Sequence, residues 1–475
     1  MNLLNQIVNY APSKLVPGAI GFVAVPIYAK LLGPDELGTF SIIIATLSIL
    51  SSITISWISG LVIRFHSKFN TKILALSLNR RALYSTILGL IIWMIICVQY
   101  SNKTFSLMVS ILGIVWLMGN NYIEYSLAWL RAAGSTKSYS RISVVKSIMA
   151  FLFSFLLLIT LGSSFELLIL GQVIVVALIS SHLIHNGQKH FQHEITAQTN
   201  ALSMNINSYI IPTVLLNVLT LLNSIGDRFL IAKLLSFEDL GIYVANYDIT
   251  EKSVFMVNSI FILISSATAF KIFEQRSAYE MMKYLEKIFD LYVLITLPIV
   301  LTFVLYNDEI SNFLLGFSYV SGADVIPAIA VSSLFIGFMH RYSVILAAHK
   351  KFYHIASASL MALIVNLSLC YFFAEKYGIV GVAVATFFSH LCWLCIVIFY
   401  CRNHTVPSFP AKIFLLSLLS YLCICIIVQL LGDHFFNEHA NKNIILIFLN
   451  FLLYFIVVYF TCLREMLLLR NEYYF

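Results

Sequence analysis

Charged and polar side chains interrupt sequence stretches that are otherwise almost entirely apolar. A charge at the depth of a lipid bilayer is costly unless it faces protein or water, so each such residue is a candidate functional group. Arginine and lysine bind phosphate groups, whereas aspartate, glutamate and histidine can carry a proton or hold a cation. The candidates for lining a polar cavity are Lys14, Arg64, Glu124, Asp227, Arg228, Asp248, Glu251, Lys252, His340 and Arg341.

These residues belong to polar stripes at helical spacing. In the apolar run 206–234, a stripe recurs every three or four residues and so falls on one helix face. Its members are Asn217, Thr220, Ser224 and Asp227. Similar stripes on the runs beginning near residues 10, 106 and 241 predict a shared hydrated surface, and its excess of cations favours an anionic, phosphate-bearing cargo.

The same residues allow a second interpretation, in which they stabilise the helix bundle instead of binding a cargo. Asp227 or Glu251 would then form buried ion pairs with Arg228 or Lys252. The four histidines within 182–193 are expected to belong to a polar linker and not to a metal site. We find no catalytic residues, and we predict no metal and no cofactor.

The composition determines which elements position these residues. Of 475 residues, 60% are hydrophobic and only 11% are charged, against about 25% charged in soluble domains. This excludes a soluble globular enzyme, a disordered chain and a nucleic-acid binder. Runs long enough to cross a bilayer occur fourteen times, at 10–32, 38–62, 82–99, 106–129, 147–162, 166–184, 206–234, 241–269, 288–306, 325–347, 355–374, 379–400, 412–431 and 443–462.

The loops between these runs are strongly asymmetric in charge. One set of loops, together with the C-terminal tail, carries twenty Lys and Arg residues, and the opposite set carries three. Because cytoplasmic loops are enriched in Lys and Arg, both termini are predicted to be cytoplasmic. The first cation, Lys14, lies inside the first run, so we expect no cleavable signal peptide. The largest outer connection, 307–324, is predicted to hold one short interfacial helix, Ile310–Phe317.

An internal repeat relates the two halves of the sequence. AKLLGPDELGTF at 29–40 returns as AKLLSFEDLGIY at 232–243, an offset of 203. Six runs separate the copies, so the halves share one orientation, related by an axis along the membrane normal. Two six-helix lobes around a central cavity are typical of an alternating-access carrier. The predicted parts are a lobe 1–184, a cytoplasmic linker 185–204, a lobe 205–400, and two further transmembrane helices with a cytoplasmic tail, 401–475.

Three segments resemble bacterial polysaccharide exporters of the Wzx (O-antigen flippase) type. They are PIYAKLLGPDELGTFSIIIATLSIL at 26–50, SIGDRFLIAKLLSFEDLGIYVANYDI at 224–249 and YGIVGVAVATFFSH at 377–390. The resemblance implies an all-α membrane protein of the multidrug/oligosaccharidyl-lipid/polysaccharide exporter superfamily. It also implies a cargo of undecaprenyl diphosphate carrying an oligosaccharide, such as the O-antigen repeat of lipopolysaccharide, moved from the cytoplasmic to the periplasmic leaflet of the inner membrane. Its implied partners are a coupling proton or sodium ion, and the polysaccharide polymerase and chain-length machinery.

Two rival functions remain open. A multidrug or cation antiporter of the same superfamily would need buried carboxylates in the first half, where Glu124 is the only acid in the interior of a run and Glu166 stands at the first position of the run 166–184. A membrane-embedded polysaccharide polymerase or glycosyltransferase would need a sizeable outer loop with catalytic Arg, Asp or Glu. The loop 307–324 offers Asp308, Glu309 and Asp324 but no arginine.

Overall fold

A computed structural model describes residues 10–66, 71–99, 106–187, 199–404, 406–435 and 442–458, and all regular structure in these ranges is helical. The chain divides into two compact units. The first unit comprises Met1–Val244 with Cys370–Glu375, and the second comprises Ala245–Leu369 with Lys376–Phe475. Each is described by itself below.

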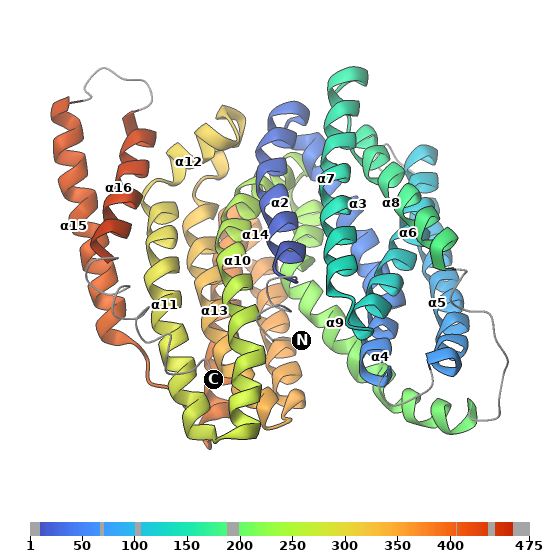
Figure 1. The fold of residues 1–475 in the computed structure, drawn as a ribbon. Helices are drawn as coiled ribbons and strands as arrows, with labels where there is room; N and C mark the ends of the chain where they lie inside the picture. The colour runs from blue at the N-terminus through green and yellow to red at the C-terminus, as the bar shows by residue number, and fades with distance from the viewer. Residues whose placement is uncertain are drawn as a thin grey trace. The chain divides into compact units, whose positions relative to one another are not determined.

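The first unit is a bundle of long helices (Figure 1). Gly33 adopts φ 82°, which separates the first two helices, and the second opens with Pro34 and two acids in its first turn, a favourable helix start. A π-helical turn, η1, interrupts this second helix. The elements are α2 (Pro12–Leu32), α3 (Pro34–Ser51), η1 (Ser52–Ser56), α4 (Trp57–Phe65), α5 (Thr71–Gln99), α6 (Leu107–Ala132), α7 (Thr136–Leu161), α8 (Phe165–Gly187), α9 (Thr199–Leu234) and the start of α10 (Phe237–Gln275).

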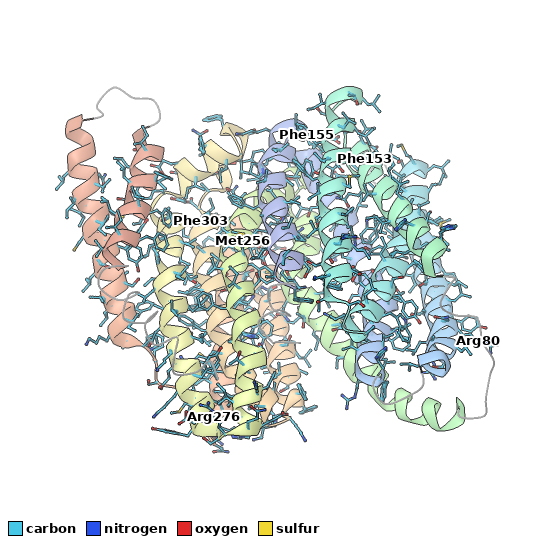
Figure 2. All side chains as sticks on the ribbon, viewed as in Figure 1. Arg80, Phe153, Phe155, Met256, Arg276 and Phe303 are labelled. Atoms are coloured by element: carbon cyan, nitrogen blue, oxygen red, sulfur yellow. The ribbon has the colours of Figure 1, made fainter. Side chains whose placement is uncertain are left out.

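The second unit continues α10 and adds α11 (Ala278–Leu305), α12 (Asn307–Leu314), the 3₁₀ turn η4 (Phe317–Gly322), α13 (Val325–Ala348), α14 (Phe352–Cys401) without its residues Cys370–Glu375, α15 (Ala411–Phe435) and α16 (Lys442–Val458). The long α14 is broken at Gly378, whose φ of 57° and ψ of −144° are not helical. This break falls between the predicted runs 355–374 and 379–400. In Figure 2, Arg276 lies at the end of α10 and Phe303 near the far end of α11.

Helices overlie all fourteen predicted apolar runs as far as the described residues reach, and residues 459–462 of the last run lie outside them. Within the described residues, ten candidate membrane spans satisfy both length and hydropathy, so the chain is a multi-pass membrane protein. The count of fourteen crossings and the boundaries of the two lobes stay predictions. The short outer helix predicted at Ile310–Phe317 is present as α12, three residues earlier. Helix α7 begins at Thr136, well before the predicted run 147–162, because helical structure continues through residues that a hydropathy count excludes.

The two copies of the internal repeat meet within the first unit. A side chain added at Gly38 would collide with the Phe237 carbonyl oxygen and lie 2.9 Å from the Gly241 backbone nitrogen. A side chain added at Gly241 would collide in turn with the Pro34 carbonyl oxygen and lie 3.0 Å from the Gly38 nitrogen. Pro34 and Phe237, like Gly38 and Gly241, are equivalent positions of the repeat. The contact is therefore reciprocal, and it requires glycine on both sides.

The last two helices dock on α11 through aromatic and polar contacts. The Tyr454 hydroxyl donates to the Leu294 carbonyl over 3.0 Å and lies 2.6 Å from Ser417 Oγ. Tyr421 bonds Thr302, and both tyrosines are fully buried in a core that joins α11, α15 and α16. Because tyrosine hydroxyls buried in a membrane protein need partners, these contacts hold α15 and α16 in a defined position on the second unit.

Candidate functional site

Two of the predicted residues lie next to each other on α9 of the first unit. Asp227 is 5% exposed and accepts a 2.5 Å hydrogen bond from the Tyr243 hydroxyl on α10. The half-buried Arg228 donates from Nη1 to Ser41 Oγ on α3 over 2.9 Å. Both charges are thus held by side chains of neighbouring helices, as buried polar groups require.

A second group lies on α10 of the second unit. Lys252 Nζ is 2.7 Å from Asp248 Oδ2, one helical turn away, and Glu251 is half-buried beside them. The sequence suggests Asp227 or Glu251 as the ion-pair partner of Lys252, but the partner in the structure is Asp248. The Lys252 side chain keeps 31% of its surface exposed. The pair therefore leaves donor capacity on an ammonium group in the middle of a predicted span.

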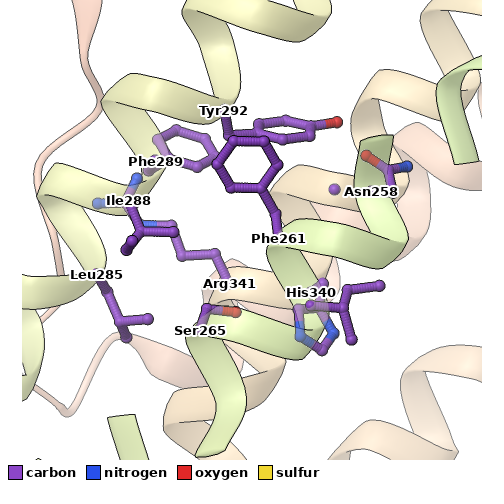
Figure 3. A pocket seen from close by; sticks show the side chains of 11 residues that line it. Asn258, Phe261, Ser265, Leu285, Ile288, Phe289, Tyr292, His340 and Arg341 are labelled. Carbon is purple, nitrogen blue, oxygen red and sulfur yellow. The ribbon is translucent and has the colours of Figure 1, made fainter. Parts of the chain in front are cut away.

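His340 and Arg341 line a pocket within the second unit, between α10, α11 and α13 (Figure 3). The pocket, including the part that is open to its surroundings, has a volume of about 340 Å³, and it is walled mainly by apolar and aromatic side chains such as Phe261 and Tyr292. His340 Nε2 lies 3.1 Å from Ser266 Oγ. No other predicted site residue lines this pocket within the described part of the chain.

Arg341 is deeply buried, with only 5% of its surface exposed. Its guanidinium carbon lies 4.0 Å from the centre of the Phe289 ring, and its Nη2 donates to the Ser408 carbonyl over 3.2 Å. Glu286 accepts from the Ser408 backbone nitrogen over 2.7 Å and from its hydroxyl over 2.8 Å. Arg341 and Glu286 therefore hold the loop between α14 and α15 from two sides, which gives this cation a structural task.

The remaining predicted residues are exposed in the first unit. Lys14 lies on α2 and Arg64 in the last turn of α4, and Glu124 lies on α6. Glu124 Oε1 is 3.4 Å from Lys146 Nζ on α7, and the same ammonium donates to Asn120 Oδ1 over 2.8 Å. The structure thus brings Glu124 to a cation that the sequence interpretation assigned to a loop.

Lys146 is the functional candidate that sequence reasoning missed. Hydropathy places it among the cations of the loop before the run 147–162, whereas it lies ten residues inside α7. A signal was available in the spacing, because Tyr139 and Lys146 are seven residues apart and so share a helix face. A count based on hydropathy alone could not use that signal.

A histidine pair in the second unit predicts a pH-dependent stability. His404, in the loop after α14, packs against His349 with ring centres 4.0 Å apart and ring planes inclined by 40°. Burial lowers the pKa of His404, and the charges of His349, Lys351 and His354 lower it further. An unfolded histidine has a pKa of about 6.5. Below that pH the unfolded chain binds more protons than the folded protein, so the free energy of unfolding falls as the pH falls.

We expect His404→Asn to reduce the fall in melting temperature between about pH 7.5 and about pH 5.5, measured in detergent. Asn403→Ala should leave it unchanged, and an unaltered profile for His404→Asn would contradict the assignment.

Comparison with known proteins agrees with this architecture. The sequence profile of the family described as "Polysaccharide biosynthesis protein" matches residues 27–324. The lipid II flippase MurJ, in an inward closed conformation, has a similar structure with a TM-score of 0.73 and 18% identity, over 98% of this chain and 99% of that chain. An inward-facing multidrug resistance MATE family transporter of the MOP superfamily gives a TM-score of 0.65 with 12% identity, over 83% of this chain and 97% of that chain.

A MOP superfamily transporter from Pyrococcus furiosus gives a TM-score of 0.55 with 14% identity, over 85% of this chain and 96% of that chain. At these identities the structural matches show a shared fold and no more. No functionally curated protein is similar enough to the sequence to count as a relative. The family profile, in contrast, matches more than half of the chain, and the chain belongs to the polysaccharide biosynthesis protein family.

Proposed function

We propose that the chain is a flippase that moves undecaprenyl-diphosphate-linked oligosaccharide repeat units, such as those of O-antigen, from the cytoplasmic to the periplasmic leaflet by alternating access. It would act in the bacterial inner membrane with both termini in the cytoplasm. Family membership and the MurJ-like fold support transport of a lipid-linked substrate. A coupling proton or sodium ion and association with the polysaccharide polymerase belong to the same proposal.

The observation that carries the proposal is a pair of lysines inside long helices whose side chains stay partly uncovered by protein. Lys252 keeps 31% of its side chain exposed and Lys146 keeps 25%, although each is paired with a carboxylate. A cation that served only to hold helices together would be expected to be sealed by its partner. Cations that stay accessible at this depth suit a negatively charged cargo.

The physical task explains why such groups are needed. A sugar headgroup with a diphosphate cannot cross hydrocarbon, because its polar groups would lose the hydrogen bonds that water provides. Polar side chains replace those hydrogen bonds, cations bind the diphosphate, and the prenyl tail stays in lipid. In the proposed reaction no covalent bond is made or broken, so the protein needs no nucleophile and no acid–base pair.

The proposal is tested by deleting the gene and identifying the lipid-linked intermediate that accumulates. We expect an undecaprenyl-diphosphate oligosaccharide on the cytoplasmic leaflet, detected by its inaccessibility to a sugar-binding lectin added from the periplasmic side. Accumulation of the intermediate on the periplasmic side would indicate a polymerase. Unchanged lipid intermediates together with increased drug sensitivity would indicate a multidrug antiporter.

Variants at Arg228 and Lys252 separate cargo binding from a structural role. We expect Arg228→Ala to lower export severalfold at unchanged protein level, with Ser41→Ala as the control that removes only its hydrogen-bond partner. Because Lys252→Ala would leave Asp248 buried without its cation, the sharper variant is the double change Asp248→Asn with Lys252→Gln, which removes both charges. Normal export by this double variant would assign the pair to structure alone.

A further inference from the structure

Helices α6 and α7 of the first unit form an antiparallel hairpin with two matched polar positions on each helix. Glu124 and Arg131 are seven residues apart on α6, and Tyr139 and Lys146 are seven apart on α7, so each pair shares one helix face. Arg131 lies over the Tyr139 ring, 5.9 Å from its centre, while Glu124 contacts Lys146 at 3.4 Å. The hairpin therefore carries two polar clusters about 10 Å apart along its axis.

The first is the tyrosine–arginine cluster, formed by Tyr10, Arg131 and Tyr139 together with Lys14, which lies four residues beyond Tyr10 and interacts with it electrostatically. The rings of Tyr10 and Tyr139 stack with centres 5.1 Å apart and an interplanar angle of 14°. Arg131 Nη1 donates to the Tyr10 hydroxyl over 3.2 Å, and the two hydroxyls lie 3.5 Å apart. The stacked tyrosines fix the guanidinium from one side and leave its other donors free to bind a ligand.

The two cations of this cluster are exposed, although one lies on α2 just inside its first turn and the other at the end of α6. In the described part of the chain, no carboxylate lies within ion-pair distance of Arg131 or Lys14. Their charge is therefore available to an external anion. An arginine fork and a lysine ammonium in one cluster match the chemistry of a diphosphate, since the fork can bind two oxygens of one phosphate and the ammonium an oxygen of the next.

The second is the lysine–glutamate cluster, formed by Asn120, Glu124 and Lys146. Behind it, Asn120 Nδ2 donates to Ser51 Oγ over 3.2 Å, and Ser51 Oγ donates to Asn121 Oδ1 over 2.7 Å. These buried bonds orient Asn120 so that its oxygen accepts from Lys146. Glu124 keeps 46% of its side chain exposed, so the cluster presents both an acceptor and a donor to solvent.

We propose that the two clusters form one sugar-diphosphate site, in which Arg131 and Lys14 bind the diphosphate and the Glu124–Lys146 pair binds hydroxyl groups of the first sugar. This assignment rests on the proposed function, because it names the part of the chain that holds the headgroup. The separation of about 10 Å between the clusters is the length of a diphosphate joined to one sugar ring. Paired acceptors and donors are the groups that hydroxyls need, whereas a second phosphate would be repelled by Glu124.

The test measures binding of two probes to the purified full-length protein in detergent: undecaprenyl diphosphate, and undecaprenyl diphosphate carrying one N-acetylglucosamine. We expect Arg131→Ala to weaken binding of both probes by about tenfold or more, the loss of a charge-assisted contact. We expect the double change Glu124→Gln with Lys146→Gln to weaken binding of the sugar-bearing probe only. Phosphatidylglycerol serves as a competing anionic lipid.

Arg141→Ala is the matched control. Like Arg131, Arg141 is an exposed arginine, but it lies on α7, two residues beyond Tyr139. It should leave both affinities unchanged. If Arg131→Ala does not fold, Arg131→Lys keeps the charge and loses the fork, and its affinity for both probes should fall severalfold. Affinities equal to those of the parent for the folded Arg131 variants, or an equal loss in Arg141→Ala, would overturn the site and leave the proposed function standing. Failure of the parent protein to prefer either probe over phosphatidylglycerol would overturn the proposed function itself.

Discussion

Replacing Gly38 with alanine is expected to destabilise the protein by about 3 kcal/mol, the upper end of the usual range for overpacking, because the new methyl group would collide with backbone that cannot rotate away. The group in its path is the carbonyl oxygen of Phe237, with the Gly241 nitrogen only 2.9 Å away. The two helical turns would have to separate, and the contact between the repeat copies would be lost. The measurement is the yield of monodisperse protein and its melting temperature in detergent.

The control for this change is Gly18→Ala on α2, where nothing lies within 4 Å of the added methyl group. Alanine favours a helix over glycine by roughly 0.5–1 kcal/mol, so this variant should be as stable as the parent or slightly more stable. Equal melting temperatures for Gly38→Ala and Gly18→Ala would mean that the two repeat turns do not touch.

Truncating Tyr454 to alanine is expected to lower the free energy of unfolding by about 3 kcal/mol or more. The change removes a fully buried ring and leaves a cavity between α11, α15 and α16. It also leaves the Leu294 carbonyl without its 3.0 Å hydrogen bond. Thermal unfolding in detergent would report the loss, and limited proteolysis would show whether α15 and α16 detach first.

Two other variants on α16 serve as controls for that result. Tyr454→Phe keeps the ring and should cost only about 1 kcal/mol, the value of the hydroxyl bonds. Phe448→Ala removes an aromatic ring that is 70% exposed, so it should leave the melting temperature close to that of the parent. A Tyr454→Ala protein as stable as Phe448→Ala would contradict the role given to this core.

Much of the fold was predictable because a membrane helix must be apolar along most of its length. The run 325–347 became α13 (Val325–Ala348) and the run 166–184 lies inside α8 (Phe165–Gly187) for that reason. Hydropathy carried no information where polar residues continue a helix, as in the first turns of α7. It also gave no sign of the π-helical turn η1, which depends on local hydrogen bonding and not on apolar character.

The types of residue in the candidate site were predictable from the sequence, but the contact partners of these residues were less so. A charge within an apolar run is visible in the sequence, and that criterion found Arg228, Lys252 and Arg341. The partner of each charge depends on packing between segments that are distant in the chain. The Ser408 carbonyl lies 67 residues beyond Arg341, and the Ser41 hydroxyl lies 187 residues before Arg228. No spacing rule within one helix reaches that far.

The reciprocal glycine contact has a consequence for the origin of the chain. Position 34 of the first copy faces position 241 of the second, and position 38 faces position 237, so each copy makes the same contact with the other. That exchange is the signature of an isologous interface, the kind that joins identical subunits. In a dimer of two half-length chains one glycine position would serve both subunits, whereas in a single chain each copy of the repeat needs a glycine of its own.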